Sequence, residues 1–388
     1  MIKKPPFASL RMFYPQTRDP GMLLWPEAQA GYASAFLTKE LSMNPYDIRV
    51  ETMYPFPKYH AELLRNLPKF PEKAFLFFLE NYYHSSIFND RYVASLFDAV
   101  PDAFEGKEVI IQSSKMGEEA SVEYMERFPF VNVVVRTDVE FYFLEKYVRG
   151  KNDSEIANVT YRGADGKPRV SAAEEVTFDL SECVFSAYED GVAMREKDNY
   201  HRIVGFLNED TGEEDDKFYY KKTRASFLRQ LDATFLKKKA LITTGRGCRY
   251  KCTYCYRGAK YSKVRQLPIE TIRKDLDILK NCGYSTIYVY DDCFGTTNHD
   301  RMREIVELFS SYDFEYQIAI RYEMCTTENL ELMKGLKLSF VQIGLQSASK
   351  ATNAKIGRNF HLERMKKVID FLKKNGAYVS LDVILGLP

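Results

Sequence analysis

Three cysteines lie close together a little past the middle of the chain. Cys248, Cys252 and Cys255 stand in the segment GRGCRYKCTYCYRG. Thiolate sulfur binds both zinc and iron–sulfur clusters, and this spacing lets a single loop surround one metal group. No fourth cysteine is near, and the closest histidines, His201 and His299, are far away in sequence. Three ligands on a four-iron cube leave one iron open to a further ligand, so the pattern favours a cluster over the alternative of zinc.

From residue 239 onward, strand-like and helix-like segments alternate regularly. Strands are predicted at 240–244, 286–290, 316–320, 340–345 and 378–385, and helices at 269–281, 300–310, 327–334 and 362–374. This alternation is typical of a parallel (β/α) barrel of the TIM type, built from right-handed crossovers. The cysteine loop then follows the first strand, at the end where such barrels carry their active sites. The sequence stops at Pro388, where another helix would begin, so we expect a partial barrel, truncated at its carboxyl-terminal end.

The cysteine motif, with Tyr254 before its last cysteine, resembles the signature of the radical S-adenosylmethionine (SAM) enzymes. The resemblance covers about residues 240–388. It implies two cofactors, a [4Fe-4S] cluster and SAM, with the open iron binding the amino and carboxylate groups of SAM. It also implies an electron donor such as flavodoxin or ferredoxin. Cleavage of a carbon–sulfur bond of SAM would then give a 5′-deoxyadenosyl radical that abstracts hydrogen.

The same resemblance implies SAM-binding roles for residues at the ends of the second and third strands. Asp291 and Asp292 stand where the family carries a polar motif near the SAM amino group, and a carboxylate suits an ammonium group. A helix-capping role is the alternative for these aspartates. Arg321 would pair with the SAM carboxylate, or else lie in a surface ion pair.

The later strand ends resemble the family less closely. Gln346 and Ser347 correspond to a polar pair near the SAM ribose, with glutamine in place of the usual acidic residue. Gly386 lies in the apolar end of the fifth strand, which resembles the segment beside the adenine. The glutamate that often follows in the family is not reached by this sequence.

Residues 1–190 are predicted to form a separate, Rossmann-like α/β domain. A strand, a helix and a strand at 108–113, 117–127 and 131–136 follow one another in the order of a parallel sheet, to which 50–53 could add a strand. The segment Ser113 to Gly117 falls between a strand and a helix, where open α/β sheets bind ligands.

Three features of this first domain resemble radical SAM enzymes with an amino-terminal cobalamin-binding domain. They are a helix start at 138–140, an Asp165-Gly166 hairpin turn after a tyrosine–arginine strand, and the FDL run at 178–180. The resemblance implies cobalamin as a further cofactor. One departure is that the sequence has no Asp-x-His-x-x-Gly loop, and His60 and His84 are predicted to be structural. Either cobalamin binds without a histidine ligand, or the domain has lost it and serves as a scaffold.

Composition and charge restrict the remaining possibilities. The polar stretch at 191–238 is predicted to be a linker to the barrel at 239–388. The formal net charge of +1 shows no large basic excess, which removes the simplest argument for nucleic acid as a partner, and we expect none. There is neither an apolar run of about 20 residues nor a signal-like start, so we predict a cytoplasmic protein without a membrane partner. Seven cysteines, an odd number, fit metal binding better than disulfides.

The leading interpretation is a cobalamin-dependent radical SAM methyltransferase that acts on an unactivated carbon of a small metabolite or peptide. One alternative is a radical SAM enzyme for rearrangement, oxidation or cyclisation, whose cobalamin-like domain binds no cobalamin. Another is a non-catalytic, metal-bearing RNA-binding module, because basic and aromatic residues alternate around the cysteines. A methylthiotransferase is excluded, since only Cys183 lies upstream for a second cluster. No residue is singled out as catalytic, and the sequence does not specify the substrate.

Overall fold

The computed structural model describes residues 7–15, 28–53, 57–79, 86–114, 116–174, 186, 188, 239–255, 263–295 and 298–388. They fall into two compact units, an amino-terminal unit up to residue 174 that includes Tyr188 and a carboxyl-terminal unit from residue 239 that includes Ser186. Several predicted features lie outside the described residues, namely the linker at 191–238, the FDL run at 178–180, His84, Cys183, His201 and Lys115.

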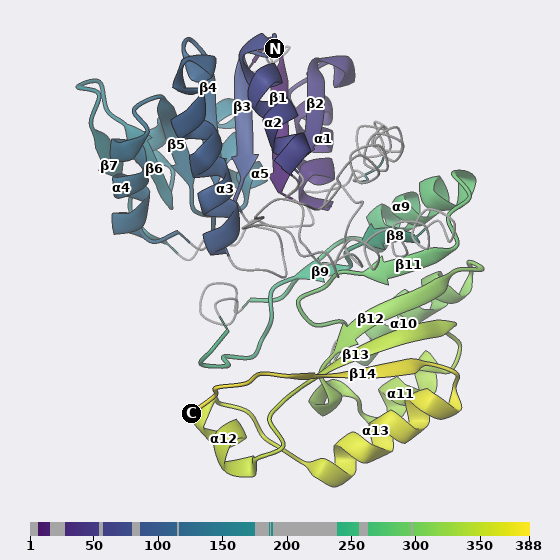
Figure 1. Cartoon of the computed structure of the whole chain (residues 1–388). Coiled ribbons are helices and arrows are strands. Elements are labelled where there is room, and N and C mark those ends of the chain that lie inside the picture. The colour runs from purple at the N-terminus through teal and green to yellow at the C-terminus, as the bar shows by residue number, and fades with distance from the viewer. Residues whose placement is uncertain are drawn as a thin grey trace. The chain divides into compact units, whose positions relative to one another are not determined.

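The amino-terminal unit is built on a seven-stranded sheet with the order β2-β1-β3-β4-β5-β6-β7 (Figure 1). Its first five strands in this order are parallel, and β6 and β7 are added antiparallel at one edge. The strands are β1 (Leu10–Pro15), β2 (Ile48–Met53), β3 (Ala74–Phe78), β4 (Glu108–Gln112), β5 (Val131–Val135), β6 (Val159–Arg162) and β7 (Pro168–Val170). The helices are α1 (Ala28–Lys39), α2 (Pro57–Asn66), α3 (Ser86–Ala99), α4 (Glu118–Arg127) and α5 (Val139–Phe143), with short helical turns at Pro45–Asp47, Leu67–Lys69, Pro101–Phe104, Leu144–Val148 and Asp153–Glu155.

Apolar side chains cover both faces of this sheet. Every residue of β3 is buried, as expected for a parallel strand with helices on each side. On one face, Phe77 stacks on Phe13 with ring centroids 4.3 Å apart and meets Phe97 of α3 edge-on at 5.0 Å. Strands buried on both faces read as continuous apolar runs, which is why β4 and β5 could be predicted from the sequence.

The predicted Rossmann-like organisation is confirmed, but two of its strands, β1 and β3, were not predicted as strands. The hairpin of β6 and β7 turns at Asp165 and Gly166, where the backbone φ of +76° suits glycine. β1 was not predicted, because Arg11 interrupts its apolar run and Pro15 ends it. It nevertheless lies between β2 and β3 in the sheet.

The carboxyl-terminal unit contains a five-stranded, fully parallel sheet of order β14-β13-β12-β11-β8, the confirmed partial barrel. The strands are β8 (Lys239–Ile242), β11 (Thr286–Val289), β12 (Glu315–Ile320), β13 (Leu338–Gln346) and β14 (Tyr378–Val383). The helices are α9 (Ile269–Asn281), α10 (His299–Ser310), α11 (Thr327–Met333), α12 (Lys350–Lys355) and α13 (Leu362–Lys374), with a 3₁₀ turn at Tyr322–Met324. A small antiparallel pair joins β9 (Gly245–Arg246) to β10 (Arg265–Gln266).

The predicted strands and helices of this unit match the observed ones to within two residues. Helices α9 and α13 have the predicted bounds, whereas β14 ends at Val383 instead of residue 385. The β9–β10 pair and α12 were missed because they are too short for periodicity to detect. Helix α12 instead has a local signal, since the Ser349 side chain accepts a hydrogen bond from the Thr352 N–H at 3.2 Å.

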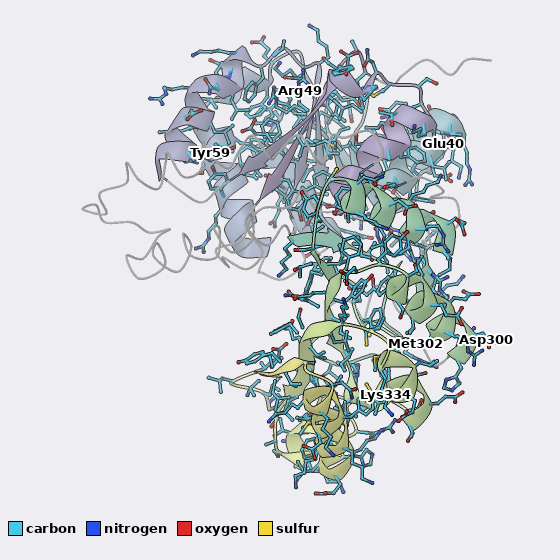
Figure 2. All side chains as sticks on the ribbon, turned by 90° about the vertical axis from the view of Figure 1, so that its right-hand side faces the viewer. Glu40, Arg49, Tyr59, Asp300, Met302 and Lys334 are labelled. Atoms are coloured by element: carbon cyan, nitrogen blue, oxygen red, sulfur yellow. The ribbon has the colours of Figure 1, made fainter. Side chains whose placement is uncertain are left out.

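The helices of this unit are amphipathic. On α10, the Met302 side chain is buried, while Asp300 projects outward and pairs with Arg303 (Figure 2). On the sheet, β14 has a strand partner on one side within the described residues and exposes Tyr378 and Val383. No helix among the described residues is long and apolar enough to cross a membrane.

Candidate functional site

The cysteine loop begins at the end of β8, where the Asp291 carboxylate holds the backbone. One oxygen of Asp291 accepts hydrogen bonds from the Thr243 hydroxyl at 2.8 Å, the Thr244 N–H at 2.7 Å and the Gly245 N–H at 3.2 Å. The Thr244 hydroxyl donates to the other oxygen. Burial raises the pKa of Asp291, and these donors act against that rise. The carboxylate therefore ties the end of β11 to the start of the loop.

Asp292 acts on the next part of the same loop. Its carboxylate accepts the Gly247 N–H at 2.6 Å, one residue before Cys248. The residues that the sequence predicts to meet the SAM amino group thus both bind the backbone that leads into the cysteines. A role for either aspartate toward SAM stays a prediction.

The three cysteines have different environments. Cys252 is buried, with 7% of its surface exposed, whereas Cys248 and Cys255 are partly exposed. A turn in which the Cys255 N–H donates to the Cys252 carbonyl at 2.9 Å connects two of them. Burial raises the pKa of Cys248, while the Tyr250 N–H and the charge of Arg321 act to lower it. Among the described residues, no three His, Cys, Asp or Glu side chains are grouped as ligands of a single metal ion.

Arg321, which follows β12, lies against the cysteine loop. One Nη atom donates to the Cys252 sulfur at 3.1 Å, the other donates to Glu323 at 2.8 Å, and the guanidinium stacks 3.6 Å above the Tyr250 ring. Burial disfavours the charged form of Arg321, but Glu323 and Cys252 outweigh that effect, so the pKa of Arg321 is raised. The structure thus pairs Arg321 with a candidate ligand sulfur. Both Nη atoms of Arg321 already have partners, and its Nε atom has none among the described residues. The predicted contact of Arg321 with the SAM carboxylate stays a prediction.

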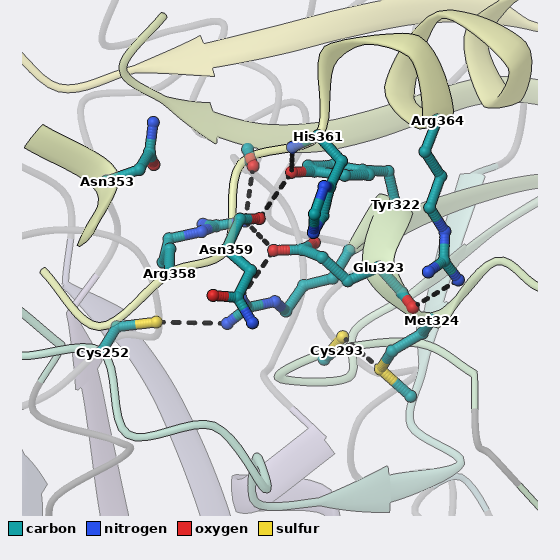
Figure 3. Close-up of polar contacts among 12 residues, drawn as sticks. Cys252, Cys293, Tyr322, Glu323, Met324, Asn353, Arg358, Asn359, His361 and Arg364 are labelled. Carbon is teal, nitrogen blue, oxygen red and sulfur yellow. Dashed lines mark hydrogen bonds and ion pairs between the residues drawn. The ribbon is translucent and has the colours of Figure 1, made fainter. Parts of the chain in front are cut away.

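The ion pair of Arg321 and Glu323 is part of a larger buried network that was not predicted from the sequence. Glu323 Oε1 also accepts a hydrogen bond from Arg358 at 3.3 Å (Figure 3). Arg358 further donates to the Gly344 carbonyl at 2.8 Å and to the Tyr254 hydroxyl at 3.4 Å. Arg358 is 5% exposed. A Cβ on Gly344 would lie 3.3 Å from Arg358, so a glycine inside a strand was the only local signal of this close approach.

The backbone of the cysteine loop also meets the chain after α12. The Thr253 N–H donates to the Ile356 carbonyl at 3.2 Å. A Cβ on Gly357, whose φ is +71°, would lie 3.3 Å from the Lys251 carbonyl. The loop that carries Cys252 is therefore supported by hydrogen bonds from backbone and side chains of distant segments.

Gln346 and Ser347 lie at a register shift where β13 ends. Gln346 has a φ of +64°, which is rare for a residue other than glycine, and its carbonyl accepts the Ile384 N–H at 3.0 Å. Ser347 uses its hydroxyl to accept the Ser349 N–H. The bond from Ile384 brings the chain just before Gly386 beside Gln346, so the structure gathers these predicted positions at one end of the sheet.

Two further candidate groups can be placed in part. In the amino-terminal unit, Ser113 and Ser114 are buried at the end of β4, while Lys115 lies outside the described residues. The His60 ring meets Tyr92 edge-on at 4.9 Å, and burial lowers its pKa, as expected of a structural histidine. In the cysteine loop, Tyr250 and Tyr254 contact internal arginines, and positions 256–262 of the basic and aromatic stretch lie outside the described residues.

A family model described as the Radical SAM superfamily matches residues 242–388. These residues form a radical SAM domain. Along with the confirmed partial barrel, this match bears out the resemblance that the cysteine motif indicates. No curated protein matches the chain.

Solved structures resemble the whole chain in fold. A cobalamin-dependent SAM radical enzyme, OxsB, with aqua-cobalamin and SAM bound, matches with a TM-score of 0.66 and 16% identity over 99% of this chain and 50% of that one. The radical SAM methyltransferase TsrM from Kitasatospora setae, with cobalamin and a [4Fe-4S] cluster bound, matches with a TM-score of 0.63 and 13% identity over 98% of this chain and 70% of that one. The likeness covers both units, so the amino-terminal unit has a B12-like fold. The chain spans half the length of OxsB.

The donor set on the cysteine loop suits the cluster that the family implies. Three thiols lie on one loop, and the buried one receives a charge-assisted hydrogen bond from Arg321, which stabilises a thiolate. Metal ligation requires thiolates, and metal sites commonly add such donors around their ligands. The radical SAM family implies a [4Fe-4S] cluster and SAM as cofactors, and cobalamin is bound in the two solved structures named above.

Proposed function

We propose that the chain is a radical SAM enzyme whose cluster is held by Cys248, Cys252 and Cys255. The observation that carries the proposal is the cysteine loop itself, which starts at the end of β8 and is held by Asp291, Asp292 and Arg321. When bound, the cluster supplies the electron that cleaves SAM reductively. The chain's own residues hold the loop in place, and SAM would bind along the ends of the strands, where such barrels carry their active sites.

The reaction that we propose is a cobalamin-dependent methyl transfer to an unactivated carbon of a small metabolite or peptide. The support is the B12-like fold of the amino-terminal unit and the buried polar residues at the end of β4, where an open α/β sheet binds its ligand. Gln112 adds to this edge a buried amide oxygen that has no partner among the described residues. Such an atom is suited to accept a hydrogen bond from a ligand.

Two assays on the full 388-residue chain test these proposals separately. After anaerobic reconstitution, we expect four irons per chain and formation of 5′-deoxyadenosine from SAM with a chemical reductant. A preparation that contains zinc, or that never cleaves SAM, would refute the radical SAM assignment and favour the RNA-binding module. Stoichiometric uptake of cobalamin, read from corrin absorbance, supports the methyltransferase, whereas a lack of uptake supports the rearrangement or oxidation class.

The physiological setting follows from this chemistry. A radical SAM enzyme needs an electron donor, and we propose a flavodoxin or ferredoxin in the cytoplasm. Oxygen destroys exposed clusters, so activity is expected under anaerobic assay conditions alone. Reduction of the cluster by a purified flavodoxin system, in place of the chemical reductant, checks this partner.

A further inference from the structure

Three charged side chains form a buried row beside the cysteine loop. Glu323 lies between Arg321 and Arg358, and its Oε1 atom is 2.8 Å from the first and 3.3 Å from the second. The side chains of Arg321, Glu323 and Arg358 are 10%, 11% and 4% exposed. Two arginines share one carboxylate, so the row carries one surplus positive charge.

The surplus charge lies next to Cys252, the one cysteine of the motif that is buried. Arg321 reaches the Cys252 sulfur at 3.1 Å, and Arg358 reaches the hydroxyl of Tyr254, between the second and third cysteines, at 3.4 Å. The Arg321 guanidinium is further held by Tyr250 on the same loop. Both arginines of the row thus form hydrogen bonds with the segment that would bind the cluster.

We infer that Arg321, Glu323 and Arg358 act as positioning residues that hold a net positive charge against Cys252 and thereby bias the cluster toward its reduced form. This inference rests on the proposed cluster. Reduction by one electron adds a negative charge to the cluster, so a fixed positive charge nearby favours the reduced state. Hydrogen bonds to ligand sulfur act in the same direction, and both are known determinants of cluster potential.

If the row acts through its charge, removing a positive side chain and removing the negative one should shift the midpoint potential of the cluster in opposite directions. A merely structural role would not produce opposite shifts. Arg358→Gln removes the surplus charge, so the midpoint potential of the cluster should fall. Glu323→Gln leaves two uncompensated arginines, so the potential should rise. A tenfold change in the equilibrium between the two oxidation states corresponds to 59 mV for a one-electron couple, and we expect shifts of at least this size.

The experiment is a potentiometric titration of the reconstituted 388-residue chain without SAM, followed by electron paramagnetic resonance of the reduced cluster. The matched control is Arg364→Gln, which removes an exposed arginine that touches Glu323 only at its backbone carbonyl, 2.8 Å away. Its potential should stay at the wild-type value. Arg358→Lys keeps the charge and should also remain near wild type.

The outcomes separate this inference from the proposed function. If the wild-type chain holds no four-iron cluster, the proposed function itself fails. If the cluster is present but Arg358→Gln and Glu323→Gln shift its potential in the same direction, or no further than Arg364→Gln does, the inference is overturned. Should Glu323→Gln take up no cluster, the comparison of Arg358→Gln with Arg358→Lys decides, since equal potentials in these two variants contradict a role for charge.

Discussion

The Asp291 carboxylate, at the end of β11, accepts the backbone N–H of Thr244 at 2.7 Å, just beyond the end of β8. Neighbouring strands of a parallel sheet end at the same edge, so a short acidic side chain on one can bind the backbone that leaves the other. This single residue receives four donors of the segment that leads into the cysteine loop. These bonds hold the start of the cysteine loop against the end of the sheet.

Replacing Asp291 by asparagine should destabilise the carboxyl-terminal unit. The amide supplies one acceptor oxygen in place of two and turns an NH₂ group toward buried donors. We expect a loss of about 1–3 kcal/mol in the free energy of unfolding of the metal-free protein, measured by chemical denaturation. Asp300→Asn is the control, because Asp300 is exposed and its ion pair among the described residues is with Arg303 in the same turn of α10. Equal stability of the two variants would contradict the role assigned to Asp291.

Cys252→Ala should abolish the cluster. Two remaining cysteines seldom hold a four-iron cube, and Arg321 would lose its sulfur partner. Iron content, cluster absorbance and 5′-deoxyadenosine formation should all be lost together. Cys282→Ala provides the control, since Cys282 is a free cysteine at the end of α9, outside the motif. A Cys252→Ala chain that keeps a full four-iron signal would remove this residue from the ligand set.

Gly245→Ala should disturb the start of the loop by a steric effect. A Cβ at this position would lie 2.6 Å from the Arg265 carbonyl in the paired strand β10, and a backbone atom cannot move aside cheaply. The expected cost is about 1–3 kcal/mol, with reduced cluster incorporation. Gly117→Ala, where a Cβ meets no atom within 4 Å, should cost at most about 1 kcal/mol. Thermal unfolding and iron content of both variants give the comparison.

Gln346→Gly separates backbone strain from a role in binding. The φ of +64° costs a side-chain-bearing residue about 1–2 kcal/mol, and glycine is free of this cost but loses more entropy on folding. We expect stability to stay within about 1 kcal/mol of wild type while SAM affinity, measured by equilibrium dialysis, falls. Ser42→Gly relieves a similar φ of +55° in the other unit and should leave SAM affinity unchanged. Unaltered SAM affinity in Gln346→Gly would remove this residue from the predicted ribose contact.

His60 should make the stability of the amino-terminal unit depend on pH. Burial lowers its pKa from the usual 6.5, so the unfolded chain takes up a proton at a higher pH than the folded one. The stability contribution is therefore complete above about pH 6.5 and is lost as the pH falls from there toward the folded pKa. Denaturation midpoints between pH 5 and 8 measure this slope. His60→Gln should flatten the curve, and an unchanged slope would assign the dependence to other groups.

The sequence predicted the strands and helices that repeat, but not the contacts between them. Strands β11 and β12 and helices α9 and α13 were found because their apolar residues recur with the period of the element. Arg358 was missed, since it lies 104 residues from its partner Tyr254 and nothing near it in sequence resembles a motif. Arg321 was predicted to be a site residue, but its contact with Cys252, 69 residues away in sequence, depends on tertiary approach. Whether it also meets SAM stays a prediction.

In the amino-terminal domain, too, elements with strong local sequence signals were predicted and those that depend on distant contacts were not. The apolar runs of β4 and β5 and the Asp165-Gly166 turn carry strong local signals, so their elements were predicted. β1 carries a weak signal, because its Arg11 pairs with Glu51 of the neighbouring strand β2 and with Glu72, just before β3. A buried ion pair of this kind interrupts the apolar pattern from which strands are recognised.

The buried hydroxyl of Ser186 donates to Asp275 on α9, although Ser186 precedes the first strand of the barrel by more than fifty residues of chain. Asp275 is fully shielded from solvent in this arrangement. A shortened protein that starts at residue 239 would therefore admit water to α9 and deprive it of one of its polar contacts. Anyone wishing to express the radical SAM domain alone should retain Ser186.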